Sequence, residues 1–178
     1  MVVIEGKVIK LTKKYFPEIA KAMLENNPKL TVKVGDGIGF MAQAEAYYDV
    51  IIVDCSDPIG PGEGLFTYEF YKNTYKALKQ DGLFVQQTES PFMHQTLIQK
   101  IWKSVSEIFP ITRLYTTFIP LYPSGMHCFT IGSKKYDPLT WKPNRAQTFK
   151  TRYYNEGIQR SAFVLPNFIK ELLYGEEK

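Results

Sequence analysis

Short apolar runs of strand length alternate along this 178-residue chain with segments whose apolar residues recur at helical spacing. The apolar or alternating runs predict strands at 2–4, 30–34, 48–53, 83–86, 113–119 and 126–133. The helix-period segments predict helices at 7–15, 17–25, 38–45, 63–79, 91–109 and 155–174, with Asp81-Gly82 closing the fourth of them. This alternation predicts an α/β fold with a parallel sheet covered on both faces, and the last two strands can pair antiparallel.

The most informative stretch begins with the apolar run from Tyr48 to Val53. The run is rich in β-branched residues and apolar on both faces, which is typical of a buried parallel strand. Asp54 follows it directly, and Asp57 comes three residues later among prolines and a glycine that prevent a regular element. Ligands of open α/β sheets bind just beyond the carboxyl ends of strands, so two acids lie where a site would form.

A single aspartate at a strand end often caps the next helix or starts a turn. The pair favours function more strongly, because two carboxylates in one crevice repel each other unless a cation lies between them. An amine suits this position better than a metal ion, which would need further His, Asp or Glu ligands nearby. Asp36 is a third acid just beyond a predicted strand, but an aspartate between Gly35 and Gly37 is also a common turn residue.

Composition predicts one globular domain over residues 1–178, with 44% hydrophobic and 22% charged residues. The net charge of +4 comes from scattered Lys and Arg rather than the clustered basic face of a nucleic-acid-binding protein. No apolar run reaches membrane-spanning length and no signal peptide is recognised, so we expect a cytoplasmic protein. Cys55 and Cys128 lack metal-type spacing and are expected to be free, buried thiols.

The stretch 48–61 resembles the signature of the spermidine synthases, the polyamine aminopropyltransferases. The resemblance covers nearly the whole chain and includes 34–37, 63–66, Gln87, 122–125, 153–155 and 162–166. It implies a doubly wound, Rossmann-like methyltransferase-type sheet, mostly parallel with a late antiparallel strand pair. It also implies aminopropyl transfer from decarboxylated S-adenosylmethionine to a diamine such as putrescine, which gives spermidine and methylthioadenosine. The donor is a co-substrate, so neither a cofactor nor a metal is expected.

The resemblance also implies roles for individual residues. Asp54 would accept the proton of the attacking amine, and Asp57 would hold the diamine cation. The remaining residues of the amine side would be Cys55, Ser56, Gln87 and Tyr122. On the donor side, the adenine amino group would contact Asp36, with Gly37 and Pro61 alongside.

The start of the chain departs from the family pattern. Family members carry an N-terminal β-rich domain, a first Rossmann strand and a Gly-rich loop that match nothing in this sequence. The acid that would hold the donor ribose is replaced by Val3, which cannot accept hydrogen bonds from hydroxyl groups. We therefore expect an N-terminally truncated fold with a complete acceptor half and a largely missing donor half. The strands flanking the missing one could pair directly, or another chain could cover the gap.

Three functions remain open from the sequence. The first is an active aminopropyltransferase, and the second is an impaired paralogue that serves as a structural or regulatory subunit of a full-length synthase. The missing Gly-rich loop and Val3 favour the second over the first, but the family resemblance makes the first our main expectation. The third is a methyltransferase, which Asp54 and Asp57 argue against because methyl transfer needs no diamine anchor. We expect a homodimer or homotetramer, possibly with a longer paralogue, and neither a nucleic-acid nor a membrane partner.

Overall fold

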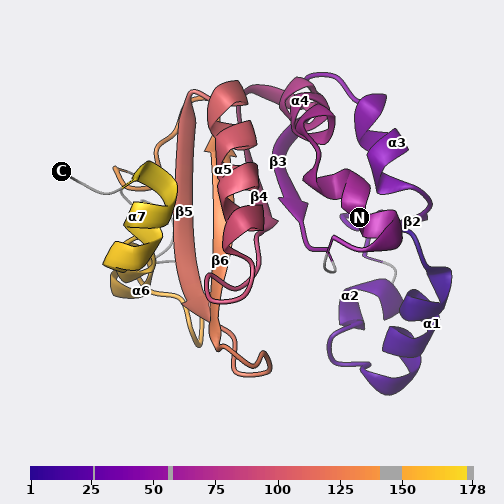
Figure 1. Ribbon diagram of the computed structural model, residues 1–178. Helices are drawn as coiled ribbons and strands as arrows, with labels where there is room; N and C mark the ends of the chain where they lie inside the picture. The colour runs from indigo at the N-terminus through magenta and orange to yellow at the C-terminus, as the bar shows by residue number, and fades with distance from the viewer. Residues whose placement is uncertain (26, 56–57, 141–149, 176–178) are drawn as a thin grey trace. The chain divides into compact units, whose positions relative to one another are not determined.

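The computed structural model describes residues 1–25, 27–55, 58–140 and 150–175, without the side chain of Pro61. Its backbone contacts group the chain into two compact units, Met1–Gln43 and Ala44–Lys178, whose elements are labelled in Figure 1. They are called unit 1 and unit 2 below, and each is described by itself. The single domain expected over 1–178 stays a prediction.

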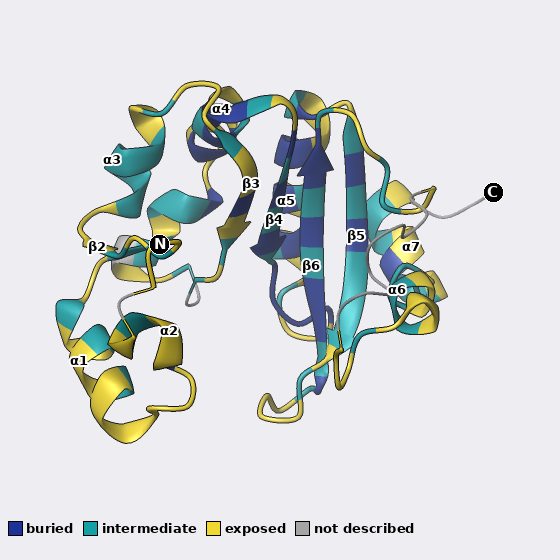
Figure 2. Cartoon of the chain, turned by 180° about the vertical axis from the view of Figure 1, so that it is seen from behind, coloured by how far each residue is buried: buried dark blue, intermediate teal, exposed yellow. Residues whose placement is uncertain are grey.

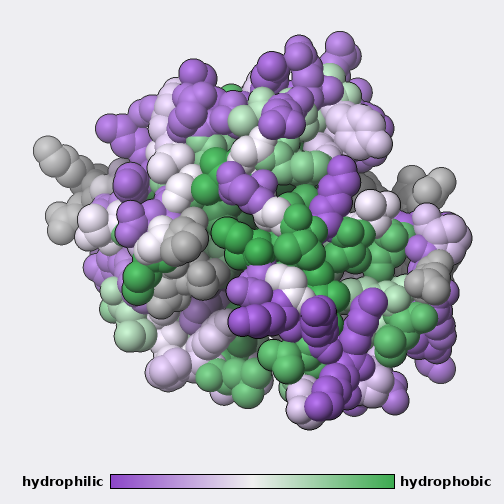
Figure 3. Space-filling view, turned by 90° about the vertical axis from the view of Figure 1, so that its right-hand side faces the viewer, coloured by the Kyte–Doolittle hydropathy of each residue, from purple (hydrophilic) through white to green (hydrophobic). Residues whose placement is uncertain are grey.

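Unit 1 contains a two-stranded parallel sheet and three helices. Its elements are β1 (Val2–Val3), α1 (Gly6–Tyr15), α2 (Lys21–Leu24), β2 (Lys33–Val34) and α3 (Gly37–Ala42). The predicted strand at 30–34 and the predicted helix at 17–25 are therefore shorter than expected. Ile19 is 76% exposed, and α1 has no buried residue. Large apolar side chains are exposed in this unit: Ile4, Val8, Leu11, Ile19 and Val34. Figure 3 shows hydrophobic surface, drawn in green, on the side of the molecule that faces the viewer there.

Unit 2 contains a four-stranded sheet in the order β3-β4-β6-β5. Its elements are β3 (Tyr48–Val53), the 3-10 helix η1 (Gly60–Phe66), α4 (Tyr68–Ala77), β4 (Leu78–Gln87), α5 (Gln95–Ile108), β5 (Ile111–Phe118), β6 (Met126–Ser133), α6 (Glu156–Ala162) and α7 (Asn167–Tyr174). β3 and β4 pair in parallel, whereas β6 runs antiparallel to both β4 and β5. The predicted α/β fold with a late antiparallel strand pair is confirmed.

The core of unit 2 lies between the sheet and the helices α5 and α7. Ile98, Leu114, Cys128 and Ile169 form a buried cluster there, and β6 is the most continuously buried strand in Figure 2. Burying one such aliphatic side chain contributes about 1.5–3 kcal/mol, so this layer holds the strands in place. Tyr115 points to the opposite face of β5, where its ring lies 5.5 Å from that of Phe163 after α6.

The helix predicted over 63–79 is wrong in its boundaries. Thr67 separates η1 from α4, because its hydroxyl caps α4 by accepting a hydrogen bond from the Phe70 N–H at 3.2 Å. The helix ends at Ala77, and Leu78 already belongs to β4. The closing helix predicted at 155–174 is likewise two helices, α6 and α7, and the second begins directly after Pro166.

Asp81 and Gly82 lie inside β4 rather than at the end of a helix. The β3–β4 ladder is irregular there, since Tyr48 pairs with Leu78 whereas Val50 pairs with Leu83. A Cβ atom at Gly82 would lie 2.9 Å from the Leu78 side chain and 3.1 Å from the Tyr48 carbonyl oxygen. The glycine is therefore needed for a close approach of two strands, and not for a helix cap.

β3 has the predicted bounds, but the expected burial on both faces is wrong. Ile51 is buried, whereas Val50 is 48% and Ile52 is 73% exposed. β3 is also the end strand of its sheet among the described residues, where it pairs with β4. Its second edge and part of its apolar surface therefore face no neighbouring strand of unit 2.

We expect Gly132→Ala to lower the free energy of unfolding by about 1–3 kcal/mol, because it overpacks the core. A Cβ atom at this position would lie 2.6 Å from the Phe109 ring. That ring is buried and stacks on Phe84 with 6.0 Å between centroids. Urea unfolding followed by circular dichroism measures the loss. Adding Phe109→Leu to the same chain should recover part of it, and strictly additive losses would contradict this packing.

Candidate active site

The carboxyl ends of β3, β4 and β5 share one edge of the sheet in unit 2, because β4 and β5 both run antiparallel to β6. Asp54 follows the last residue of β3, and Gln87 is the last residue of β4. The register pairs Val53 with Gln86, so Asp54 and Gln87 leave the sheet side by side. Tyr122 lies in the connection from β5 to β6 at the same edge. The structure therefore brings three predicted site residues to one edge, while their roles stay predictions.

The chain after Asp54 is attached to β4 through Gln86. The Gln86 side-chain amide donates hydrogen bonds to the Leu65 carbonyl oxygen at 3.2 Å and to the Cys55 sulfur at 3.6 Å. Asp54 itself is exposed, as a residue that meets a substrate must be. The predicted site residues Asp57 and Ser56 and the side chain of Pro61 lie outside the described part of the chain.

The two cysteines differ in their surroundings. Both are free, as predicted, but only Cys128 is buried, whereas Cys55 is partly exposed. Burial raises the pKa of the Cys128 thiol to about 12, so it stays protonated near neutral pH. Burial, together with the nearby Cys55, raises the pKa of the Tyr71 hydroxyl beneath the site. The prediction that both thiols are buried is therefore wrong for Cys55. This residue lies at the candidate site, directly after Asp54.

Gln87 presents a buried side-chain oxygen, Oε1, that has no hydrogen-bond partner among the described residues. A buried acceptor without a partner is costly, and such groups are usually satisfied by water or by a ligand. Gln87 as a residue is partly exposed, so a turn of its amide could bring this acceptor to an ammonium group at the same edge.

The Tyr122 ring is half exposed, and it stacks on His127 with 4.4 Å between ring centroids and 28° between planes. Its backbone is held in a turn, in which the Tyr122 N–H donates to Ile119 and its carbonyl oxygen accepts from Gly125. Gly125 has φ +67°, a conformation that favours glycine. The aromatic ring is thus presented at the edge by a closed loop.

A buried acid at this edge was missed by the sequence reasoning. The Glu89 side chain is only 6% exposed, and its Oε2 lies 3.7 Å from His94 Nδ1 and 4.0 Å from His127 Nε2. The polar residues after β4 were the available signal. The two histidines are far from each other in the sequence, so no local pattern indicated that they meet one carboxylate.

Asp36 belongs to unit 1 and caps α3. Its Oδ1 accepts a hydrogen bond from the Ile38 N–H at 2.9 Å, and its Oδ2 accepts one from the Gly39 N–H at 3.0 Å. Gly37 is the first residue of that helix. This is the structural role that the sequence left open for Asp36, and its contact with the donor stays a prediction, as does that of Gly37.

Other features of the described residues bear on what the site can bind. They contain no group of three or more His, Cys, Asp or Glu that could hold a metal ion. None of their helices is long and apolar enough to cross a membrane. A cavity of about 580 Å³ lies between β5 and α6, but none of the predicted site residues lines it. We therefore place the candidate site at the sheet edge and not in this cavity.

Residues 1–142 match the spermine/spermidine synthase domain. The chain belongs to this family. The polyamine aminopropyltransferase of Shouchella clausii is 51% identical over 173 residues, and that of Caldicellulosiruptor bescii is 48% identical over the same length. Each match covers 97% of this chain and 62% of the relative. The chain thus spans less than two thirds of the length of these relatives.

Solved structures of spermidine synthases have the same fold as this family member. One, in complex with the transition-state analogue AdoDATO, superimposes with a TM-score of 0.91 at 36% identity, covering 97% of this chain and 59% of the other. The spermidine synthase from Thermotoga maritima superimposes with a TM-score of 0.88 at 35% identity, covering 97% of this chain and 58% of the other. The resemblance read from the sequence is confirmed for family and fold.

We expect Asp36→Ser and Asp36→Ala to separate the two roles of Asp36. Serine is about as good an N-cap as aspartate, so the first change should leave the free energy of unfolding nearly unchanged. Alanine should cost about 1 kcal/mol, because it removes both bonds to the start of α3. If Asp36 also holds the donor, both variants should weaken methylthioadenosine binding by about threefold to tenfold in titration calorimetry. Unchanged methylthioadenosine binding in the serine variant would show that Asp36 caps α3 and does not hold the donor.

Proposed function

We propose that this chain carries the acceptor site of a polyamine aminopropyltransferase, which transfers the aminopropyl group of decarboxylated S-adenosylmethionine to a diamine such as putrescine. The observation that carries the proposal is the arrangement at the edge of unit 2. An exposed carboxylate, Asp54, leaves the sheet beside Gln87, whose buried side-chain oxygen has no partner among the described residues. The family membership and the names of the relatives support the same reaction.

In the proposed reaction an amine nitrogen attacks the methylene carbon next to the sulfonium. The new C–N bond forms as the C–S bond breaks, and its electron pair goes to sulfur, so methylthioadenosine leaves as a neutral thioether. An alkylammonium has a pKa of about 10.4, so the amine is mostly protonated near neutral pH. Asp54 takes up the proton that the nitrogen must lose, and holding the free amine in line with the C–S bond supplies much of the rate.

The residues around Asp54 suit a diamine. Gln87 Oε1 can accept a hydrogen bond from an ammonium group, and the exposed face of the Tyr122 ring can lie against its charge or its methylene chain. Asp57, Cys55 and Ser56 belong to the same proposed acceptor site. No step requires a metal or a cofactor, because the donor is itself a substrate.

The donor side of the proposal involves Asp36 and Gly37 in unit 1 and Pro61 in unit 2. A second candidate function is an impaired subunit that works with a longer synthase. It is favoured by Val3, which forms part of β1 and offers no side-chain acceptor where the family resemblance places a ribose-binding acid.

We also propose that the chain self-associates as a dimer or tetramer. Among the described residues no strand pairs with the second edge of β3, and Ile52 on this strand is 73% exposed. Such an edge is a ready surface for another chain. Sedimentation velocity should show a species larger than the monomer at micromolar concentration. Ile52→Lys should shift it toward the monomer, while the control Ile19→Lys, an isoleucine 76% exposed in unit 1, should not. A monomer in the unmodified chain would contradict self-association.

We expect Asp54→Asn to lower the rate of aminopropyl transfer by about 100-fold or more, as the loss of a general base does. Asparagine keeps the size of the side chain and removes its ability to accept the proton. Release of methylthioadenosine in the presence of putrescine is the measurement. The control Asp49→Asn changes another exposed aspartate, one that pairs with Lys79 within the sheet, and should leave turnover unchanged. Unchanged turnover in the Asp54 variant would contradict its assignment as the base.

A further inference from the structure

We propose that Glu89, acting through His127, positions the Tyr122 ring on the amine side of the site. Glu89 and His127 are then positioning residues, and only Tyr122 touches the substrate. This inference rests on the proposed function for its effect on diamine binding, while the positioning itself can be observed without any substrate.

Glu89 is held in an unusual state directly after β4. Its side chain is 6% exposed, and its Oε1 has no hydrogen-bond partner among the described residues. Its backbone has φ +71°, which costs energy for any residue other than glycine and is found preferentially at functional sites. The strained backbone is kept in place by the Cys128 N–H, which donates to the Glu89 carbonyl oxygen at 2.9 Å. The fold therefore keeps a buried carboxylate at this edge although its Oε1 lacks a hydrogen-bond partner among the described residues and its backbone is strained.

The two neighbours of this carboxylate that can carry positive charge are the only histidines in the sequence, His94 and His127. His127 belongs to β6, where it pairs with Thr117 of β5, so its backbone is fixed by the ladder. The edge of its ring faces Glu89, with 4.0 Å from Nε2 to Oε2, and its face stacks on Tyr122. The imidazole thus connects the buried acid to the exposed aromatic ring.

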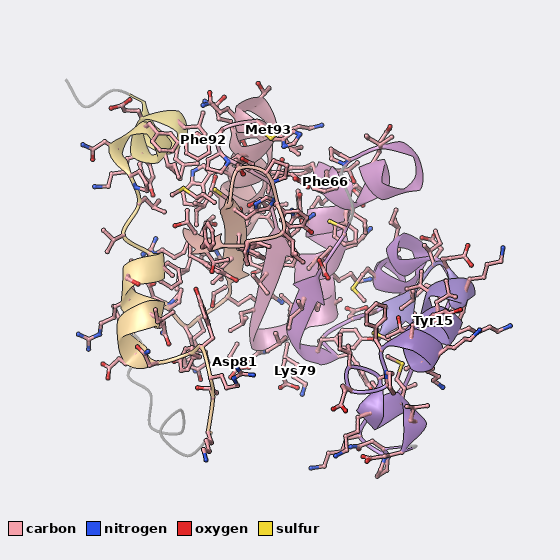
Figure 4. All side chains as sticks on the ribbon, turned by 90° about the horizontal axis from the view of Figure 1, so that it is seen from below. Tyr15, Phe66, Lys79, Asp81, Phe92 and Met93 are labelled. Carbon is pink, nitrogen blue, oxygen red and sulfur yellow. The ribbon has the colours of Figure 1, made fainter. Side chains whose placement is uncertain are left out.

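The turn between Glu89 and α5 is held in place by contacts with the helices. His94 directly precedes α5, and its N–H donates to the Ser90 carbonyl oxygen at 2.9 Å. Phe92, in the same turn, stacks on Phe168 of α7 with 5.3 Å between ring centroids, and Figure 4 shows it beside that helix. The turn that carries Glu89 toward His127 is therefore fixed at both ends.

Replacing the Glu89 carboxylate should let the His127 ring shift, because its Nδ1 has no hydrogen-bond partner among the described residues. An imidazole that has shifted within its buried position no longer offers Tyr122 the same face to stack on. The phenol ring is half exposed, so it would then sample several positions at the edge. A diamine that packs its cation or its chain against this ring would bind less tightly.

Proton NMR of the unliganded chain tests the positioning directly, because just two histidines contribute ring signals. The Tyr122 ring current should shift the His127 signals, and Tyr122→Leu should abolish that shift. Glu89→Gln should move the His127 signals toward their positions in Tyr122→Leu. The control Glu107→Gln makes the same chemical change on the exposed face of α5 and should move nothing. His127 signals that stay unchanged in Glu89→Gln would overturn the proposal.

Calorimetric titration with putrescine tests the consequence for the substrate. We expect Glu89→Gln to weaken putrescine binding by about threefold to tenfold. The same change should have no further effect in a Tyr122→Leu background, because Glu89 acts through that ring. Equal weakening in both backgrounds would overturn the proposal in favour of a general structural role for Glu89.

A second variant keeps the test decisive if Glu89→Gln does not fold. His127→Phe retains a ring beneath Tyr122 but has no nitrogen to face Glu89, so it should weaken putrescine binding to a similar extent. Undiminished binding in this variant would overturn the proposal. A folded, unmodified chain that binds no putrescine would contradict the proposed function instead, and the histidine signals would still decide whether Glu89 positions Tyr122.

Discussion

The parallel pairing of β3 with β4 is the constraint on which the site depends. Its register joins Val53 to Gln86, so that Asp54 and Gln87 emerge together at the carboxyl edge of the sheet. Because successive side chains of a strand point to opposite faces, a slip of one residue would turn Asp54 away from this position. The irregular step at Gly82, where no side chain could fit, helps to define that register. The position of Asp54 beside Gln87 thus follows in part from the close packing at Gly82, which lies away from the site within β4.

The antiparallel return of β6 supplies the second part of the site. It places His127 beside Glu89 and brings the loop with Tyr122 to the edge where Gln87 ends. The described residues proposed to meet the amine therefore all come from unit 2. The proposed donor residues Asp36 and Gly37 come from unit 1, where the aspartate already has a structural role as a helix cap. The proposed donor side consequently draws on both units, because Pro61 belongs to unit 2.

Much of the fold was predictable because local patterns were strong. β3 and β6 have the bounds that their apolar runs predict, Asp54 and Gln87 lie at strand ends, and Tyr122 lies in the loop between the last two strands. The helix predicted over 63–79 failed because Asp-Gly is a signal both for a helix end and for an irregular strand, and the local sequence cannot choose between them. Pairing with β3 decides in favour of the strand.

Two features could not be read from local patterns at all. The exposure of Ile52 depends on whether another element packs on that face of β3, which its own apolar sequence does not encode. The contact of Glu89 with His127 depends on the β4–β6 pairing, which joins residues far apart in the chain. The side chains proposed to meet the substrate could therefore be named from the sequence and its family resemblance, whereas the groups that support them appeared only in three dimensions.

Incubation of the purified chain with decarboxylated S-adenosylmethionine and putrescine tests the proposed reaction most directly. We predict that methylthioadenosine and spermidine appear in equal amounts, and only when both substrates are present. A folded chain that binds putrescine but forms neither product would contradict aminopropyl transfer by this protein and would support the role of an impaired subunit.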